Sequence, residues 1–433
     1  TPRFENHHLR LGAVPGRESA RMTLIQPFRG LHPAKGREQE IAAPPYDVMN
    51  SAEARAFAKG KPWSFMHVSK PEIDLPEDIG QYDPAVYAKA AENIHAMIDA
   101  GLLVRDEAPC YYVYRLIWGE HVQTGLVAAA SVEAYDRNHI RRHEFTRPVK
   151  EDDRVAQIEA VAAHTGPVMC AYPAAPHIDD MLAAASRAAP DLDVTAEDGI
   201  RHSIWIVSDA EFNIRLTEAF EALPALYIAD GHHRSAAASR VCAARAAENP
   251  DDMDAPWRRF LSVIFPHHQM KILDYNRVIR DLGGLDPAGL IEAVSRHFTV
   301  TESASPVRPE ATGQFGMYLG GAWYRLVIDP ALIPAGDPLG RLDINLLSDN
   351  LIAPLLGIED QRTDTRIDFV GGMRGLGELE RRVDSGEMAL AFSLYPTTMV
   401  DLMAVADIGE VMPTKSTWFE PKLADGLVSL PLD

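Results

Sequence analysis

The sequence predicts a mixed α/β protein of the α+β type, built as two closely associated lobes. Short runs rich in β-branched and aromatic residues alternate with helix-forming stretches, and most of these stretches end at Gly or Pro. A length of 433 residues suits about two or three domains. We expect one lobe over residues 22–200 and the other over 201–433. The preceding residues 1–21 mix charge, Gly, Pro and His without periodicity, which predicts a disordered tail.

Strand and helix patterns alternate along the first predicted lobe. The run TLIQPFRGL over 23–31 is typical of a strand. Residues 51–60 predict a short helix, because Ser51 can act as its N-cap and Gly60 can end it. Aromatic and β-branched residues over 63–69 favour another strand. The other elements expected in this lobe are a helix over 84–100, a hairpin of 110–117 and 123–135, a helix over 155–164, a strand over 167–172 and a helix over 179–188.

The second predicted lobe begins with a strand over 202–208. Residues 224–248 then predict a strand, a tight turn and a long Ala-rich helix. The dipeptide Gly320-Gly321 suits a two-residue turn, so 314–328 predict a hairpin. The remaining elements expected here are strands over 260–266 and 273–279, a helix over 287–298 and helical structure over 337–358.

The charge balance restricts the partners. The chain carries 62 acidic and 42 basic residues and a net charge of −20. Nucleic acids and anionic membrane surfaces are bound mainly by clustered Lys and Arg, so we expect neither as a partner. The apolar stretches are shorter than the ~18 to 20 residues that span a bilayer. Three cysteines without a CxxC pair indicate neither a zinc site nor a disulfide framework, and residues 1–21 hold no apolar core of a signal peptide; a cytoplasmic location is expected.

The most informative motif is Ala229-Asp230-Gly231-His232-His233-Arg234. An apolar strand leads to an acid, a glycine and three potentially cationic side chains at the start of a helix. Free N–H groups and the positive end of the helix dipole favour phosphate there, Gly231 permits close backbone approach, and Arg234 can hold two phosphate oxygens. Asp230 suits a phosphate-bound metal ion or the deprotonation of a hydroxyl. Alternatively, Asp230 only caps the helix and the histidines make structural hydrogen bonds.

Other charged segments offer further candidates. The basic segment 137–154 contains Arg141, Arg142 and His143, which suit a polyphosphate, an acidic neighbouring lobe or a solvated face. Lys415 lies in a proline-bounded loop with two hydroxyls and Lys422, which suits phosphate contact, although exposed lysines are common. Asp47 follows Pro44-Pro45 and Tyr46 on a rigid elbow, a suitable support for a catalytic base or a structural turn. The turn Gly371-Gly372 with its arginines is a weaker phosphate motif.

Several sequence blocks together resemble one family. The segments ADGHHRSAAASR, APPYDV, VSKPEIDLP, HEFTRPVKEDDR, RTDTRIDFVGG and PTKSTWFEPK, spread over residues 22–433, look like the family known as domain of unknown function 1015 (DUF1015). The DGHHR block is also similar to the phosphate-binding box of the ParB/sulfiredoxin superfamily, which includes the free serine kinases.

This second resemblance implies a strand-turn-helix phosphate site and a small-molecule kinase. His232, His233 and Arg234 would hold the phosphates of ATP, ADP or pyrophosphate, and Asp230 would lie near the transferred group and a Mg²⁺ ion or the substrate hydroxyl. The expected acceptor is a small hydroxyl compound, most plausibly free L-serine. From the charged segments themselves, and not from the resemblance, we expect Arg141 or Arg142 to hold further charge and Asp47 or Asp230 to accept the proton. A nucleotide-binding switch or scaffold of ParB-like type, a phosphohydrolase and a homodimer stay open.

Overall fold

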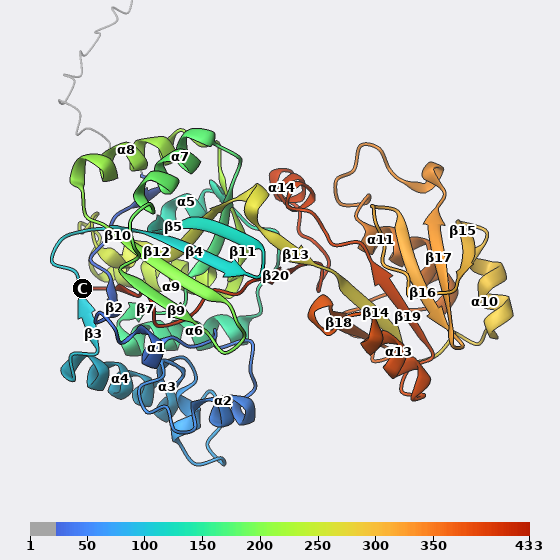
Figure 1. Cartoon of the computed structure of the whole chain (residues 1–433), viewed down its shortest axis with the longest axis horizontal. Coiled ribbons are helices and arrows are strands. Elements are labelled where there is room, and N and C mark those ends of the chain that lie inside the picture. The colour runs from blue at the N-terminus through green and yellow to red at the C-terminus, as the bar shows by residue number, and fades with distance from the viewer. Residues whose placement is uncertain (1–22) are drawn as a thin grey trace, which may run out of the picture.

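The computed structural model describes residues 23–433, so the predicted tail over 1–21 lies outside the described residues. The protein is a two-lobe α+β fold (Figure 1). We call residues 23–273 and 418–432 the first lobe, which contains a nine-stranded sheet, and residues 275–394 the second lobe, which contains a six-stranded sheet. The short antiparallel pair β13 (Lys271–Leu273) and β20 (Trp418–Glu420) joins them.

The large sheet is mixed, with the order β6-β11-β8-β12-β5-β4-β10-β9 and β1 beside β5. Only the pairs β6–β11 and β8–β12 are parallel. The predicted hairpin is present as β4 and β5. The strands are β1 (Ile25–Gln26), β4 (Tyr111–Trp118), β5 (His121–Ser131), β6 (Ile140–Arg141), β8 (Val168–Tyr172), β9 (Leu192–Thr195), β10 (Arg201–Val207), β11 (Leu226–Asp230) and β12 (Arg259–Pro266).

Both faces of this sheet are covered. Tyr111 and Val113 of β4 point into one core, and Tyr112 and Tyr114 point into another, because successive side chains of a strand alternate between its faces. Helices from within the first lobe cover one face: α5 (Val132–Asp136), α7 (Pro176–Ala185), α8 (Ala210–Glu221) and α9 (His232–Glu248). The other face packs against α14 (Met399–Asp407) and residues 423–430, which follow the second lobe in the sequence.

Residue 200, where we expected the lobes to divide, falls inside the large sheet. It lies between β9 and β10, which are hydrogen-bonded neighbours. The two sheets instead divide near Asp274, between β13 and β14 (Tyr275–Ile279).

A helical layer, formed mainly by residues between β1 and β4, lies beside the sheet. It contains α1 (Glu38–Ile41), α2 (Ser51–Ala58), α3 (Met66–Ser69), η1 (Pro71–Asp74), α4 (Pro84–Asp99) and α6 (Pro148–Val161), with the strand pair β2 (Leu31–Pro33) and β3 (Leu103–Arg105). The helix α2 confirms the prediction over 51–60, but Asn50, and not Ser51, is its N-cap and forms a capping box with Glu53. The strand predicted over 63–69 is wrong: this buried segment forms turns and α3. Burial between helices explains its apolar residues equally well.

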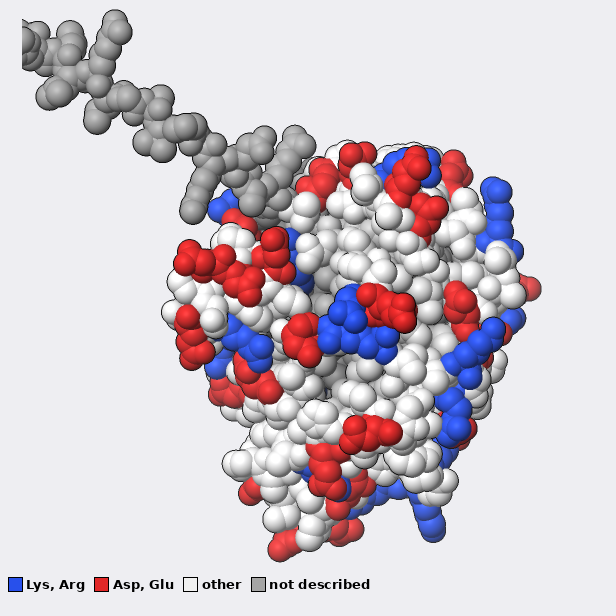
Figure 2. All heavy atoms as spheres, turned by 90° about the vertical axis from the view of Figure 1, so that its left-hand side faces the viewer, with Lys and Arg blue, Asp and Glu red and all other residues white. Residues whose placement is uncertain are grey.

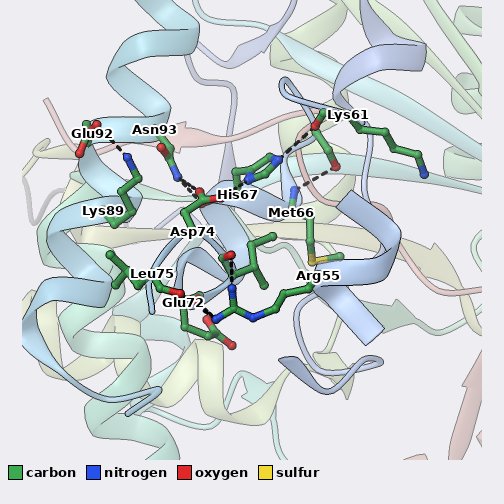
Figure 3. Close-up of polar contacts among 12 residues, drawn as sticks. Arg55, Lys61, Met66, His67, Glu72, Asp74, Leu75, Lys89, Glu92 and Asn93 are labelled. Carbon is green, nitrogen blue, oxygen red and sulfur yellow. Dashed lines mark hydrogen bonds and ion pairs between the residues drawn. The ribbon is translucent and has the colours of Figure 1, made fainter. Parts of the chain in front are cut away.

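A polar network holds this helical layer together (Figure 3). Arg55 donates hydrogen bonds to the main-chain carbonyls of residues 72, 73 and 75. His67 lies between two acceptors, the carboxylate of Asp74 at 2.7 Å from Nδ1 and the carbonyl of Lys61 at 3.1 Å from Nε2. Only the imidazolium form donates to both. The hydrogen bond with Asp74 is the main reason that the pKa of His67 is raised above 6.5.

The raised pKa of His67 predicts a pH-dependent stability. A group whose pKa is raised on folding stabilises the protein fully below its unfolded-state pKa, and this contribution disappears as the pH rises through the folded-state pKa. We expect the free energy of unfolding to fall by about 1 kcal/mol as the pH rises above about 6.5, the scale of a partly exposed ion pair. Urea unfolding of the wild type and His67→Gln at several pH values measures this loss.

His32 is the necessary control, because its pKa is also raised. Burial lowers that pKa, but the hydrogen bond with Asp106 and further contacts raise it more. The His67→Gln variant should lose part of the pH slope, and His67→Gln with His32→Gln should lose most of it. An unchanged slope in His67→Gln would show that the imidazolium is absent from the native state.

The second lobe is smaller. Its antiparallel sheet has the order β15-β17-β16-β19-β14-β18, and the predicted hairpin over 314–328 is confirmed as β16 and β17. The strands besides β14 are β15 (Phe298–Ser303), β16 (Gln314–Leu319), β17 (Ala322–Ile328), β18 (Ile367–Gly371) and β19 (Leu390–Leu394). The helices are α10 (Pro287–Val294), α11 (Asp343–Leu347), α12 (Ala353–Leu356) and α13 (Leu376–Asp384), with one π-helical turn over Ser348–Ile352.

The surface charge agrees with the negative composition. Figure 2 shows one face of the first lobe, where acidic and basic side chains are interspersed and no broad basic surface forms. Among residues 23–433, no helix combines the length and the apolar composition needed to cross a bilayer.

Candidate functional site

A cavity of about 1180 Å³ opens between three segments of the chain. They are the proline elbow around Asp47, the turn at Asp230, and the segment from Lys415 to Lys422. Tyr275 and Met373 add a wall from the second lobe. Six aromatic side chains contribute to the lining: Tyr46, Phe57, Trp63, Trp118, Tyr275 and Trp418. The cavity lining therefore combines the charged groups of these three segments with the apolar surfaces of the aromatic side chains.

The turn at Asp230 connects strand β11 directly to helix α9 and packs closely against neighbouring backbone. Strand β11 shifts its register against β8 at Asp230, and Gly231 adopts a φ of 103°, a region that side chains with a Cβ rarely occupy. A Cβ on Gly231 would lie 3.3 Å from the Cα of Val168 and 3.4 Å from the guanidinium carbon of Arg234. Among the described residues, no side chain caps α9. The main-chain N–H groups of His232 and His233 at the start of the helix therefore have no side-chain cap.

Asp230 does not cap the helix. Its Oδ2 accepts a hydrogen bond from Nζ of Lys422 at 2.8 Å, and both side chains are about three-quarters buried. Burial raises the pKa of Asp230, but the nearby charges of Lys422 and Arg234 lower it more, so that the net pKa is well below the ordinary range. The pKa of Lys422 is raised, because the attraction of Asp230 outweighs burial. Asp230 is therefore a stable carboxylate and a poor proton acceptor.

Arg234 links the turn to the elbow. Its Nη1 donates to the carbonyl of Pro167, and its Nη2 lies 3.6 Å from Oδ2 of Asp47. Its buried Nε has no hydrogen-bond partner among the described residues. Arg234 passes Gly166, where a Cβ would lie 3.3 Å from its Cδ. The guanidinium is therefore held between the turn and the elbow, with part of its hydrogen-bonding capacity unused.

The elbow is held by a second guanidinium. Arg154 stacks on the ring of Tyr46 at 3.9 Å and pairs with Asp153 at 2.7 Å. Burial raises the pKa of Tyr46 to about 12, so this hydroxyl keeps its proton. The side chain of Asp47 is 41% exposed at the rim of the cavity, with only the long contact to Arg234. Its carboxylate is thus fixed by the main chain and open to a substrate.

The histidines are neutral hydrogen-bonding groups. Nδ1 of His143 donates to the carbonyl of Ile228 at 2.8 Å, and the main-chain N–H of His143 donates to Nε2 of His232 at 3.4 Å. Burial lowers the pKa of His143 to about 4 and that of His232 well below 6.5. His233 accepts from the main-chain N–H of Arg147 at 3.1 Å, and burial lowers its pKa too. At neutral pH, these side chains supply donors and acceptors but little positive charge.

Two places in the cavity could be considered for a metal ion. His143, Glu144 and His232 have donor atoms within 4.8 Å of one another. However, Nε2 of His232 accepts a hydrogen bond, so Nδ1 carries the proton and faces Glu144 at 3.7 Å. This arrangement does not fit a metal bound by both histidines. Asp230 fits Mg²⁺ better, because Lys422 uses only its Oδ2 and Mg²⁺ in proteins commonly binds one carboxylate together with phosphate oxygens.

The loop at Lys415 forms the opposite wall. Lys415 has a φ of 60°, and its carbonyl accepts a hydrogen bond from the buried Arg277 at 3.2 Å. Nζ of Lys415 lies 5.7 Å from the centre of the Tyr275 ring. Arg277 also donates to the carbonyl of Tyr275 and stacks on Phe369. A buried guanidinium therefore fixes the loop that brings Lys415 to the cavity.

The structure does not bring Arg141 and Arg142 into the cavity lining. Arg141 pairs with Asp407 of α14, and its guanidinium lies 5.7 Å from the centre of the Tyr227 ring. Arg142 stacks on Tyr135 at 5.1 Å. Of the arginine-rich segment 362–375, only Met373 lines the cavity. The remaining candidates do meet there: Asp47, His143, Asp230, Gly231, His232, His233, Arg234 and Lys415.

Sequence reasoning did not single out Lys422 or find Asp425. Lys422 was noted only as part of its loop, and no motif marks its pairing with an acid 192 positions away. Asp425 is buried behind Arg234 and accepts from Ser69 at 2.7 Å. Burial raises its pKa to about 7. The block PTKSTWFEPK, which ends at Lys422, was the available signal for Lys422 but not for Asp425.

Comparisons with known proteins give one strong and several distant matches. No curated protein matches the chain. A conserved hypothetical protein from Pyrococcus furiosus is 15% identical, with 70% of this chain and 93% of that chain covered and a TM-score of 0.31. A free serine kinase in complex with AMP is 14% identical, with 70% and 92% covered and a TM-score of 0.31. SbnI with a C-terminal truncation, from Staphylococcus aureus, is 12% identical, with 69% and 85% covered and a TM-score of 0.35. A family model described as "Protein of unknown function (DUF1015)" matches residues 25–345.

Proposed function

The chain belongs to the DUF1015 family, whose description assigns no activity, and from its cavity we propose that it is a small-molecule kinase. It would transfer a phosphoryl group from ATP, ADP or pyrophosphate to the hydroxyl group of a small acceptor, and free L-serine is the acceptor that we propose. One observation carries the proposal: the uncapped start of α9 opens into a cavity beside the pair Asp230–Lys422.

The geometry of the turn at Asp230 indicates how the phosphates of the donor would be bound. The N–H groups of His232 and His233 at the start of α9 would bind phosphate oxygens, and Arg234, Lys415 and Lys422 would balance their charge. Mg²⁺ bound to Asp230 would supply further neutralisation of the phosphates. Asp230 stays ionised and paired, which suits this role better than proton transfer.

The donor is better matched by a nucleotide than by pyrophosphate. The cavity extends from the charged turn along aromatic side chains, among them Trp63, Trp118 and Trp418. Aromatic faces stack on nucleobases with little dependence on the base. Pyrophosphate would leave this surface without a partner, so ATP or ADP is the preferred donor.

Asp47 is the proposed proton acceptor. Its carboxylate lies at the rim, on the elbow fixed by Tyr46 and Arg154 and beside Arg234. The hydroxyl oxygen of the acceptor attacks the terminal phosphorus, the bond from phosphorus to the bridging oxygen breaks, and the nucleotide product, ADP from ATP or AMP from ADP, leaves with that oxygen. The hydroxyl proton passes to Asp47. Positioning and charge stabilisation supply most of the catalysis in such reactions.

The test is direct. We expect O-phosphoserine when the protein is incubated with L-serine, Mg²⁺ and either ATP or ADP, measured by mass spectrometry, and less or none with pyrophosphate. Asp47→Asn should lower the rate by about 100-fold or more with nucleotide affinity retained, the usual scale for a general base. Asp83→Asn, an exposed helix-capping acid outside the cavity lining, is the control.

Two other outcomes would replace the proposal. Tight nucleotide binding by calorimetry without any product would indicate a nucleotide-binding switch or scaffold. Release of phosphate in the absence of an acceptor would indicate a phosphohydrolase that uses water in place of the hydroxyl. Product with other small alcohols but not with serine would retain the kinase and change its acceptor.

A further inference from the structure

A second, smaller cavity lies where the second lobe meets the start of α14. It has a volume of about 290 Å³ and is formed where β19 ends, where α11 begins and where α14 begins. This is near the lower limit of the ~300 to 1,000 Å³ of typical ligand pockets, so only a small molecule fits. Its lining is separate from that of the large cavity.

The cavity contains a buried carboxylate with an unused oxygen. Asp343 as a whole residue is more than nine-tenths buried, and its Oδ1 accepts a hydrogen bond from the main-chain N–H of Gly313 at 2.8 Å. Its Oδ2 has no hydrogen-bond partner among residues 23–433. A buried, unpaired carboxylate oxygen is costly, and either a proton or a cationic ligand removes that cost. Burial, with a smaller contribution from Asp401, raises the pKa of Asp343 to about 7.

The same cavity also offers groups for an anion and for hydroxyls. Arg341 pairs with Asp401 at 3.0 Å, and its side chain is 41% exposed, so some of its donors face solvent. Thr312, Tyr395 and Thr397 are the further polar residues of the lining, while apolar residues such as Ile333 and Leu346 provide an apolar side. A cation acceptor, an exposed guanidinium and a small apolar surface together match an ammonium group, a carboxylate and a short side chain.

We propose that this cavity is a second binding site, for a small free α-amino acid, with the ligand's ammonium group at Asp343 and its carboxylate at Arg341. The proposal does not depend on the phosphotransferase activity. One hydrogen bond connects the linings of the two cavities. Oγ1 of Thr397, in the small cavity, donates to the carbonyl of Ser416 at 3.0 Å, and Ser416 lines the large cavity beside Lys415. An amino acid bound here would lie beside Thr397, which is hydrogen-bonded to the segment that carries Lys415.

Calorimetry with glycine, L-alanine, L-serine and L-threonine tests the site. We expect at least one of these probes to bind the wild type. Asp343→Asn should weaken this binding about tenfold or more; Asn is close in shape to a protonated Asp, so the fold should be preserved. Arg341→Met, at a partly exposed position, should also weaken it. Asp230→Asn, which alters the large cavity, should leave it unchanged.

The outcomes separate the two cavities. Loss of binding in Asp343→Asn and Arg341→Met, with retention in Asp230→Asn, supports the second site. No binding by any of the four probes would overturn the proposal. Binding that Asp230→Asn abolishes and Asp343→Asn preserves would also overturn it, since the amino acid would then occupy the large cavity. Failure of the kinase assay alone has no bearing on this result.

Discussion

Replacing Asp230 by Asn is expected to lower the turnover number by about 100-fold or more, while the affinity for nucleotide stays the same or increases. Removal of one electrostatic group that acts in the transition state commonly costs this much. Asparagine keeps the shape of the side chain but removes the negative charge that would bind Mg²⁺. Lys422 would then lack its carboxylate partner at 2.8 Å, and its free positive charge would attract the phosphates more strongly.

Steady-state kinetics and nucleotide calorimetry measure the two quantities separately. Asp360→Asn is the matched control, because Asp360 also pairs with a cation, Arg362 at 2.8 Å, but lies on the exposed surface outside the cavity lining. Its turnover should equal that of the wild type. Full turnover in Asp230→Asn would remove Asp230 from the mechanism. If Asp230→Asn does not fold, the carboxylate has a structural role of its own.

Replacing Lys422 by Met is expected to lower the free energy of unfolding by about 2 kcal/mol and to weaken nucleotide binding by about tenfold or more. The stability estimate lies between the ~1 kcal/mol of exposed ion pairs and the ~3 to 5 kcal/mol lost when a fully buried pair is broken. Lys422 and Asp230 are 25% and 30% exposed, and the variant leaves the carboxylate without its cation. Urea unfolding at pH 7 measures the change.

A double-mutant cycle isolates the pair. The variant Asp230→Asn with Lys422→Met should recover most of the stability that Lys422→Met loses, but no turnover, because the uncompensated charge is gone and the catalytic group is too. Lys89→Met is the matched control: Lys89 is 24% exposed and pairs with Glu92 at 2.8 Å, but that partner is 69% exposed. The free energy of unfolding of Lys89→Met should fall by less than about 1 kcal/mol. Equal losses in both lysine variants would contradict a special role for Lys422.

Local patterns predicted much of this fold. The hairpin over 314–328 followed from the dipeptide Gly320-Gly321, and the passage from β11 to α9 followed from an apolar run, a glycine and an Ala-rich stretch. Such features depend on residues within a few positions of one another. The segment 63–69 failed for the opposite reason, since its apolar residues are buried between helices far apart in the sequence.

The candidate site was predicted where it consists of one motif. Gly231, His232 and Arg234 are adjacent in sequence, and the structure places them on one cavity with Asp47 and Lys415. Arg141 was assigned to the phosphate from composition alone. Its pairing with Asp407, 266 positions away, could not be read from local sequence. The lobe boundary failed similarly, because the large sheet combines strands from both sides of residue 200.

The path of the chain has a consequence for biosynthesis. The second lobe lies in the sequence between β13 and β20, so Lys422, Asp425 and the residues that cover one face of the large sheet are made after it. A nascent chain that has just completed β12 holds the Asp230 turn but not the partner of its carboxylate. Folding of the first lobe must wait for these late contacts, which are separated by long stretches of chain and therefore form slowly. Ribosome-bound intermediates should accordingly be open to proteases until the segment around Lys422 has emerged.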